Sequence, residues 1–171
     1  MKKLFKTSLL LAAMVPAVAL AQPSAGDQEI TLGGAGGSDK DFDDSAISVQ
    51  GSWGQYLSES SLWGVRQTVN ARDSEGESVQ WDGSTRVFYD YHFGSGNGRP
   101  FVGASVGGIY GDGVDETFIL GPEVGYKHWL NDSTFVTGMV EYHFLVDSAS
   151  DVDDRYDDGA FFYSVGLGYN F

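Results

Sequence analysis

Hydrophobic and polar residues alternate along most of this chain. The last eleven residues, FFYSVGLGYNF, place apolar and aromatic side chains at the odd positions and mostly small or polar residues at the even ones. A period of two is typical of a β-strand, because successive side chains leave a strand on opposite faces. The same pattern predicts eight strands, at residues 28–37, 46–55, 62–72, 82–93, 100–110, 117–129, 134–145 and 160–171.

These expected strands differ in clarity. In 82–93, aromatic and branched residues dominate the odd positions, whereas Asp82, Arg86 and His92 lie on the even face. The strand at 28–37 is the least clear, because its glycines carry little pattern. No segment repeats apolar residues at helical spacing, so the sequence predicts an all-β protein.

The connections between the expected strands alternate in character. Three are short and carry few acidic residues, at 56–61, 94–100 and 130–133. Four are acidic and together hold 17 of the 24 acidic residues, at 38–44, 72–82, 111–116 and 147–158. In an up-and-down meander every second connection lies at the same end. The sequence therefore predicts a molecule with one strongly anionic end.

The N-terminus has the three-part layout of a secretory signal peptide. Three lysines precede an apolar run that ends in Ala-Leu-Ala, so we expect residues 1–21 to be removed and residues 22–171 to form one domain. The sequence contains no cysteine, which excludes disulfides and a lipoprotein anchor. Without residues 1–21, 24 acidic residues stand against 7 basic ones. The resulting charge of −17 argues against nucleic acid as a partner.

Aromatic residues gather near both ends of the expected strands, as they do at the two interfaces of a bilayer. No window after the signal peptide approaches the ~20 apolar residues of a membrane helix, whereas barrel strands need only ~9–11 alternating residues. The sequence thus predicts an eight-stranded antiparallel up-and-down transmembrane β-barrel with acidic extracellular loops. The rings are Trp53, Trp63, Phe93, Phe101, Trp129 and Phe135 at the short-connection end, and Trp81, Tyr110 and Phe118 at the acidic end.

The last strand also carries a resemblance to a known family. Its ending, Tyr169-Asn170-Phe171, resembles the C-terminal signature of bacterial outer-membrane β-barrel proteins. RPFVGASVGGIYGDG (99–113) and GPEVGYKHWLNDSTFVTGMVEYHF (121–144) resemble the small barrels of the outer-membrane protein A and X type. The resemblance implies a place in the bacterial outer membrane, and assembly by the barrel-assembly machinery through Tyr169 and Phe171.

The polar face of the expected strands carries charged side chains and small residues. A soluble barrel or sandwich is the structural alternative, but glycine and serine on this face favour a crowded interior over a solvated surface. Eight strands enclose a space that side chains just fill. We expect an interior ion network, because buried charges need partners. Its members are Arg66, Arg86, Asp90, Glu123, Lys127, Glu141 and His143.

Two glutamates in this set are expected to face each other. The hairpin through 130–133 places Glu123 opposite Glu141, and Arg66 or Arg86 would compensate their charge. A paired-carboxylate glycosidase site is the catalytic alternative. A structural network is favoured, because no cleft for a sugar exists inside eight strands.

Other motifs fail their templates, so no catalytic, metal or cofactor residue is expected. The segment 103–107 has the spacing of a nucleophile elbow but no helix after it. The histidines lack metal-ligand spacing, and 151–159 has Tyr156 where an EF-hand requires glycine. The expected function is a monomeric, non-enzymatic barrel serving envelope integrity or surface interaction, whose loop carboxylates share divalent cations with lipopolysaccharide. The alternatives are a narrow conduit for small or hydrophobic solutes and, third, a lipid-modifying enzyme.

Overall fold

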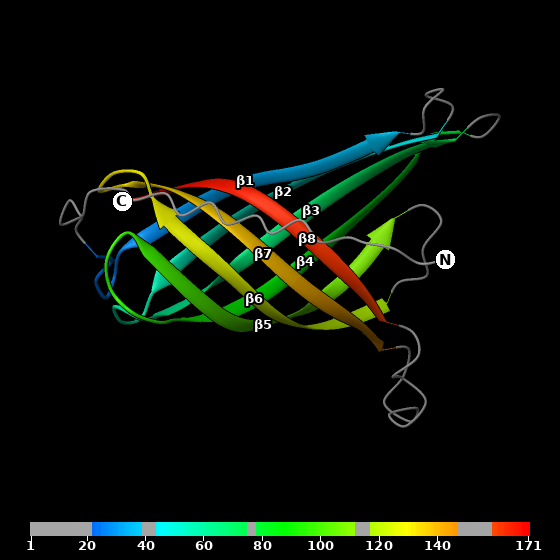
Figure 1. Ribbon diagram of the computed structural model, residues 1–171. Helices are drawn as coiled ribbons and strands as arrows, with labels where there is room; N and C mark the ends of the chain where they lie inside the picture. Colours follow the sequence, from blue (N-terminus) through cyan, green and yellow to red (C-terminus); the bar gives the residue numbers. More distant parts are fainter. Residues whose placement is uncertain (1–21, 39–43, 75–77, 112–116, 147–158) are drawn as a thin grey trace, which may run out of the picture.

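The computed structural model describes residues 22–38, 44–74, 78–111, 117–146 and 159–171. Their backbone forms one closed antiparallel barrel in which each strand pairs with the next and β8 returns to β1 (Figure 1). Within these ranges, no helix is long and apolar enough to cross a membrane. The strands are β1 (Gln28–Ser38), β2 (Asp44–Tyr56), β3 (Ser61–Ser74), β4 (Gln80–His92), β5 (Gly98–Gly111), β6 (Thr117–Trp129), β7 (Thr134–Val146) and β8 (Gly159–Asn170).

The eight predicted strands are confirmed, and their ends differ by a few residues. β5 begins at Gly98, so Arg99 is a strand residue and not part of the predicted connection 94–100. β3 and β4 extend into the predicted connection 72–82, because backbone pairing continues after the apolar alternation has ended. The remainder of the acidic connections, at 39–43, 75–77, 112–116 and 147–158, lies outside the described residues.

The three short connections lie at one end of the barrel, which we call the tight-turn end; the opposite end is the loop end (Figure 1). In the β6–β7 turn, the Asn131 side chain accepts hydrogen bonds from the backbone N–H groups of Ser133 and Thr134, at 3.0 and 2.8 Å. Phe171 lies at the same end, where its carbonyl accepts from the Gln28 N–H at 2.9 Å.

The outer face of the barrel is apolar and the inner face is polar. Val87 and Tyr89 of β4 are exposed, whereas Arg86 and Asp90, which flank this pair in the sequence, are buried. Alternation of this kind, with charges inside and branched or aromatic side chains outside, inverts the arrangement of a water-soluble barrel. It matches the apolar exterior that the sequence predicts for a transmembrane barrel.

Three of the rings assigned to the interfacial girdle lie inside the barrel instead. Phe101, Trp129 and Phe135 are all at most 3% exposed. They share the parity of the inward residues on their strands, and inward glycines of neighbouring strands make room for Phe101 and Phe135. A Cβ on Gly168 would lie 2.1 Å from Cζ of Phe135, and one on Gly125 would lie 2.3 Å from Cζ of Phe101. The prediction that these three rings face the lipid is wrong. It was based on their position near a strand end, whereas their parity along the strand points them into the barrel.

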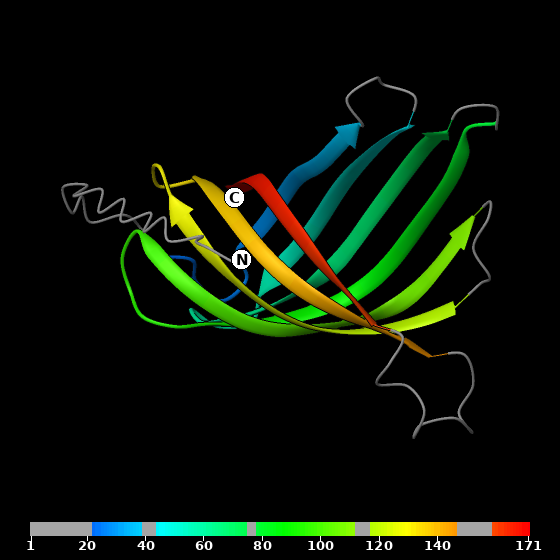
Figure 2. The same cartoon turned by 45° about the vertical axis from the view of Figure 1, so that its right-hand side comes forward.

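The barrel is closed over only part of its length at the seam between β1 and β8. Pairing between these strands runs from Glu29–Asn170 to Gly34–Val165 and ends there, although β1 continues to Ser38. On its other side β8 remains paired with β7 as far as Gly159. Figures 1 and 2 show the two strands diverging toward the loop end. The sequence of β1, QEITLGGAGGS, offers few side chains there to pack across the seam.

Candidate site in the barrel interior

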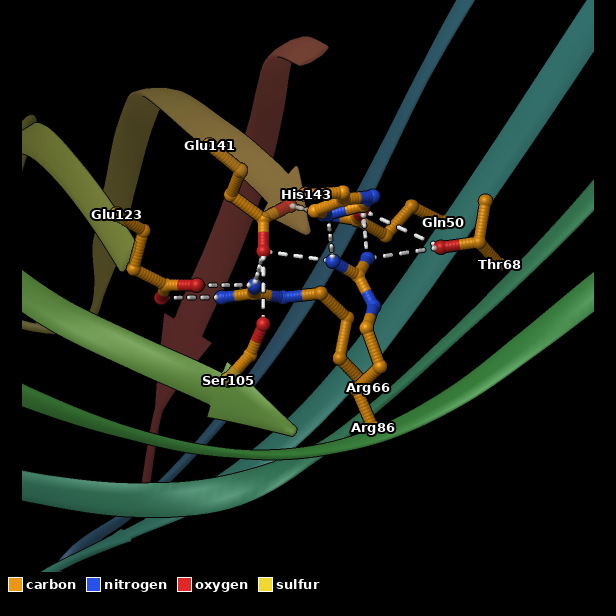
Figure 3. Close-up of polar contacts among 8 residues, drawn as sticks. All are labelled: Gln50, Arg66, Thr68, Arg86, Ser105, Glu123, Glu141 and His143. Carbon is orange, nitrogen blue, oxygen red and sulfur yellow. Dashed lines mark hydrogen bonds and ion pairs between the residues drawn. The ribbon is translucent and has the colours of Figure 1, made fainter. Parts of the chain in front are cut away.

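An arginine bridges two facing glutamates in the middle of the barrel. Glu123 of β6 pairs with Glu141 of β7, as the hairpin register predicts. From β3, Arg66 donates to both oxygens of Glu123 at 2.8 and 3.0 Å, and to Oε1 of Glu141 at 2.9 Å (Figure 3). All three side chains are at most 4% exposed. The forked guanidinium thus compensates two buried carboxylates at once.

A second arginine completes this network on the loop-end side. Arg86 donates from Nη1 to Oε1 of Glu141 at 2.6 Å and contacts Nε2 of His143 at 2.7 Å. Because arginine can only donate, Nε2 of His143 is the acceptor in this contact. Ser105 donates to the same Glu141 oxygen at 3.1 Å. Two arginines and two glutamates therefore form a charge-balanced unit, which we call the central network.

Lys127 lies apart from the central network, nearer the tight-turn end. Its Nζ donates to Oε1 of Glu29 at 2.6 Å, and Tyr56 donates to the other Glu29 oxygen at 2.9 Å. The ammonium also lies 4.9 Å from the ring centroid of Phe135. Asp90 is buried between the two groups, with Glu123, Lys127 and Arg66 among its electrostatic neighbours.

Large side chains fill the interior at the tight-turn end. His92 and Arg99, both about 1% exposed, lie among these side chains. The ring of His92 packs 5.3 Å from that of Phe101 and 5.8 Å from that of Tyr56, between centroids. We call this set the aromatic layer; it comprises Tyr56, Leu62, Phe88, His92, Phe101, Trp129 and Phe135.

Two cavities lie on either side of the central network. The larger one, about 160 Å³, is on the loop-end side and is lined by residues that include Gln50, Thr68, His143 and Phe162. The smaller one, about 30 Å³, borders Arg66 and reaches toward Lys127. The smaller volume is close to that of a single water molecule.

The geometry of this interior does not match the catalytic alternatives. Both glutamates are held by arginine and are at most 2% exposed, which leaves no room for a sugar between them. Ser105 is buried in mid-strand and donates to Glu141, whereas a nucleophile elbow needs an exposed serine at a strand-to-helix turn. Within the described ranges, no three His, Cys, Asp or Glu side chains are grouped so as to hold a metal ion.

Of the seven interior residues predicted from the sequence, Arg66, Arg86, Glu123 and Glu141 form the central network, and His143 contacts it through Arg86. Asp90 and Lys127 are also inside the barrel: Lys127 lies nearer the tight-turn end, and Asp90 has both Lys127 and the central network as electrostatic neighbours. The sequence interpretation missed Glu29, Tyr56 and Arg99. Glu29 belongs to the glycine-rich strand whose pattern was weakest, and Arg99 was assigned to a turn. The alternation along β5 could have identified Arg99 as an interior residue, because it lies two residues before Phe101, which points inward.

A closed eight-stranded antiparallel barrel with an apolar exterior and a charged interior has the fold of small bacterial outer-membrane β-barrels. The N-terminal β-barrel domain of Pseudomonas aeruginosa OprF superposes with a TM-score of 0.59 at 16% identity, over 87% of this chain and 100% of that domain. The outer membrane protein OprG from Pseudomonas aeruginosa gives 0.58 at 16% identity, over 86% of this chain and 97% of OprG.

Neisserial surface protein A is a third similar structure, with a TM-score of 0.52 at 14% identity, over 84% of this chain and 94% of that protein. No protein-family model matches the sequence, and neither does any curated protein. At these identities the likeness shows a shared fold, and the function of this chain has to be argued from its own residues.

Proposed function

We propose that this protein is exported by residues 1–21 and inserted into the bacterial outer membrane as a non-enzymatic barrel whose interior is plugged by side chains. The tight-turn end faces the periplasm, and the acidic connections face the outside. In that position the barrel serves envelope integrity or surface interaction. The apolar exterior and the fold shared with outer-membrane barrels support this assignment.

The observations that support the proposal are the ion pairs that cross the interior and the buried rings at the tight-turn end. The central network joins β3, β4, β6 and β7 across the lumen through charge-assisted bonds of 2.6–3.0 Å. Below it the aromatic layer fills the tight-turn end. A solute would have to break buried ion pairs and displace rings packed on glycine, so the barrel acts as a closed scaffold for its loops.

The partners follow from chemistry at the two ends. The acidic connections would share divalent cations with lipopolysaccharide phosphates, which the sequence supports by placing 17 carboxylates there. At the other end, Tyr169 and Phe171 are exposed on the closing strand, where the barrel-assembly machinery would bind them during insertion. The protein is proposed to act as a monomer without cofactors.

Single-channel recording on the purified protein in planar bilayers tests this proposal. We expect no steady conductance, because the central network and the aromatic layer close the lumen. The matched variant Phe135→Ala, which removes a ring from the aromatic layer, should remain closed because the central network is intact. Steady conductance of the parent protein in 1 M salt (roughly the condition in which surface charge is screened) would contradict a plugged interior.

A second candidate function is the narrow conduit, and one observation favours it. The cavity of about 160 Å³ shows that the loop-end half of the lumen is not filled by side chains. Opening the central network and the aromatic layer together would connect this cavity to the periplasm. Liposome swelling with small solutes separates the two functions, since only a conduit accelerates swelling.

A further inference from the structure

The large cavity is bounded by the incomplete β1–β8 seam. By parity Phe162 belongs to the inner face of β8, yet it is 48% exposed. Its neighbour across the ladder, Glu141 of β7, is only 2% exposed. Ala35, on the inner face of β1, is exposed as well. Both residues line the cavity, so its lining reaches the gap where β1 and β8 have separated (Figure 2).

The gap leaves backbone groups without ladder partners. Among the described residues beyond Gly34 and Val165, at 35–38 of β1 and 159–164 of β8, the two facing edges have no ladder pairs with each other. Unpaired backbone in contact with hydrocarbon costs several kcal/mol per group, so it persists only where it borders a polar space. The cavity supplies such a space. The seam is therefore suited to a molecule that has polar atoms inside the barrel and an apolar part in the membrane.

The floor of the cavity is polar but electrically balanced. Arg86 is paired with Glu141, and its Nη2 makes only long hydrogen bonds, 3.4 Å to Gln50 and 3.3 Å to Thr68. Arg72 and Asp82 also line the cavity and add one charge of each sign, so the described lining stays balanced. An additional buried charge would find no surplus of opposite charge there, whereas a hydroxyl or an ester carbonyl can bond to the amide, the hydroxyl and the guanidinium. The floor thus favours an uncharged head group.

The apolar side chains and the volume of the cavity limit the rest of the ligand. Ile119 and Phe162 line the cavity, and the Phe162 ring stacks on His143 at 4.3 Å between centroids. A cavity of about 160 Å³ is close to the ~150 Å³ that holds benzene in a protein core, which is room for a head group and the first carbons. The remaining chain has to leave through the wall, along the glycines of β1.

We propose that the cavity and the β1–β8 seam form a lateral binding site for a single-chain amphiphile with an uncharged, hydroxyl-bearing head, of the monoacylglycerol class. The head lies on Gln50, Thr68 and Arg86, and the acyl chain passes between Ala35 and Phe162 into the lipid. Continuing the existing register would bring Ala35 opposite Ser164 and close this entry. The site goes beyond the proposed scaffold role, since a barrel without conductance does not require a ligand.

The test is native mass spectrometry of the purified protein released from detergent micelles and titrated with monooleoylglycerol. We expect a saturable one-to-one adduct, and at least tenfold weaker binding of oleate and of oleylamine, which carry charged heads on the same chain. Tighter binding of oleate would overturn the uncharged head group. Equal binding of all three ligands, or adducts that never saturate, would mean partition onto the outer surface and would overturn the site.

Because the chain has no cysteine, a disulfide can be used to close the seam. In Ala35→Cys/Ser164→Cys, oxidation should reduce the adduct at least tenfold and reduction should restore it. The matched pair Leu32→Cys/Leu167→Cys joins register partners on the outer face, and its oxidation should change nothing. Equal binding by the oxidised and reduced Ala35–Ser164 pair would refute entry through the seam.

A second pair of variants applies if that disulfide does not form. Ala35→Trp fills the entry, whereas Leu32→Trp adds the same ring to the lipid-facing side of β1. Only Ala35→Trp should lose the adduct, with heat-modifiable migration on gels showing that both variants are folded. Retained binding by folded Ala35→Trp would overturn the proposal. Conductance of the same samples is scored separately, so failure of the site and failure of the plugged barrel are distinguishable.

Discussion

Arg66→Ala is the substitution that most directly tests the central network. Arg66 donates three hydrogen bonds of 2.8–3.0 Å, two to Glu123 and one to Glu141. In the described part of the chain, Glu123 has no other arginine or lysine within ion-pair distance, whereas Glu141 also has Arg86. Removing Arg66 therefore leaves Glu123 buried without its counter-ion, and removing Arg86 does not.

The expected loss follows from these contacts. Three charge-assisted bonds at roughly 1.5–3 kcal/mol each set an upper bound. Once Arg66 is removed, water in the cavity of about 30 Å³ beside it can reach the carboxylate of Glu123. This hydration lowers the free-energy cost of the substitution. We expect about 3–5 kcal/mol, as for other broken buried ion pairs. Glu123→Gln should cost about 1–2 kcal/mol, because Arg66 keeps Glu141 and the repulsion between the two glutamates disappears.

Urea unfolding in lipid vesicles, followed by tryptophan fluorescence, measures these differences. With a slope of about 2 kcal/mol per M, Arg66→Ala should lower the midpoint by about 2 M and Glu123→Gln by less than 1 M. Arg72→Ala, an exposed arginine on the same strand, is the matched control and should stay within about 0.5 kcal/mol of the parent. If Arg66→Ala unfolds like the control, the interior charges are hydrated and the conduit function is favoured.

Three further predictions test other parts of the barrel. Deleting Phe171 should lower the folded yield in the outer membrane without changing export, and unchanged surface levels would reduce Phe171 to a lipid contact. Protease added to intact cells should cut within 147–158, whereas cleavage confined to the short connections would reverse the topology. Gly168→Ala should destabilise the barrel by about 1–3 kcal/mol in urea, because its Cβ would lie 2.1 Å from Phe135, and Phe135→Leu should restore part of the loss. No recovery in that double variant would place the strain elsewhere.

The sequence was sufficient for the strands because lipid and interior impose opposite chemistry on alternate positions. β4 illustrates this, since its exposed valine and tyrosines alternate with buried Arg86, Phe88 and Asp90. The facing of Glu123 and Glu141 was equally accessible, because a short turn fixes the register of its hairpin. Both predictions depend only on residues of the same strand or the same hairpin, which are close in sequence.

Other features depend on contacts that one strand does not encode. The direction in which Arg66 reaches, to β6 and not to a nearer strand, depends on the tilt of the whole barrel. The extent of pairing between β1 and β8 depends on two strands from opposite ends of the chain. Glu29, on the glycine-rich strand, could be recognised as a partner of Lys127 only once closure placed β1 in the barrel.

Glycine has opposite consequences in two parts of this barrel. At Gly64, Gly125 and Gly168, an aromatic ring from a neighbouring strand occupies the space that a side chain would take, and the wall is sealed from within. At Gly33 and Gly34, the nearest atoms are backbone oxygens of Val165 and Ser48, and no ring lies across them. The β1–β8 ladder ends at the second of these glycines, in the pair Gly34–Val165. The placement of glycine relative to inward rings thus separates the packed wall at the tight-turn end from the β1–β8 seam, where the ladder stops at Gly34–Val165.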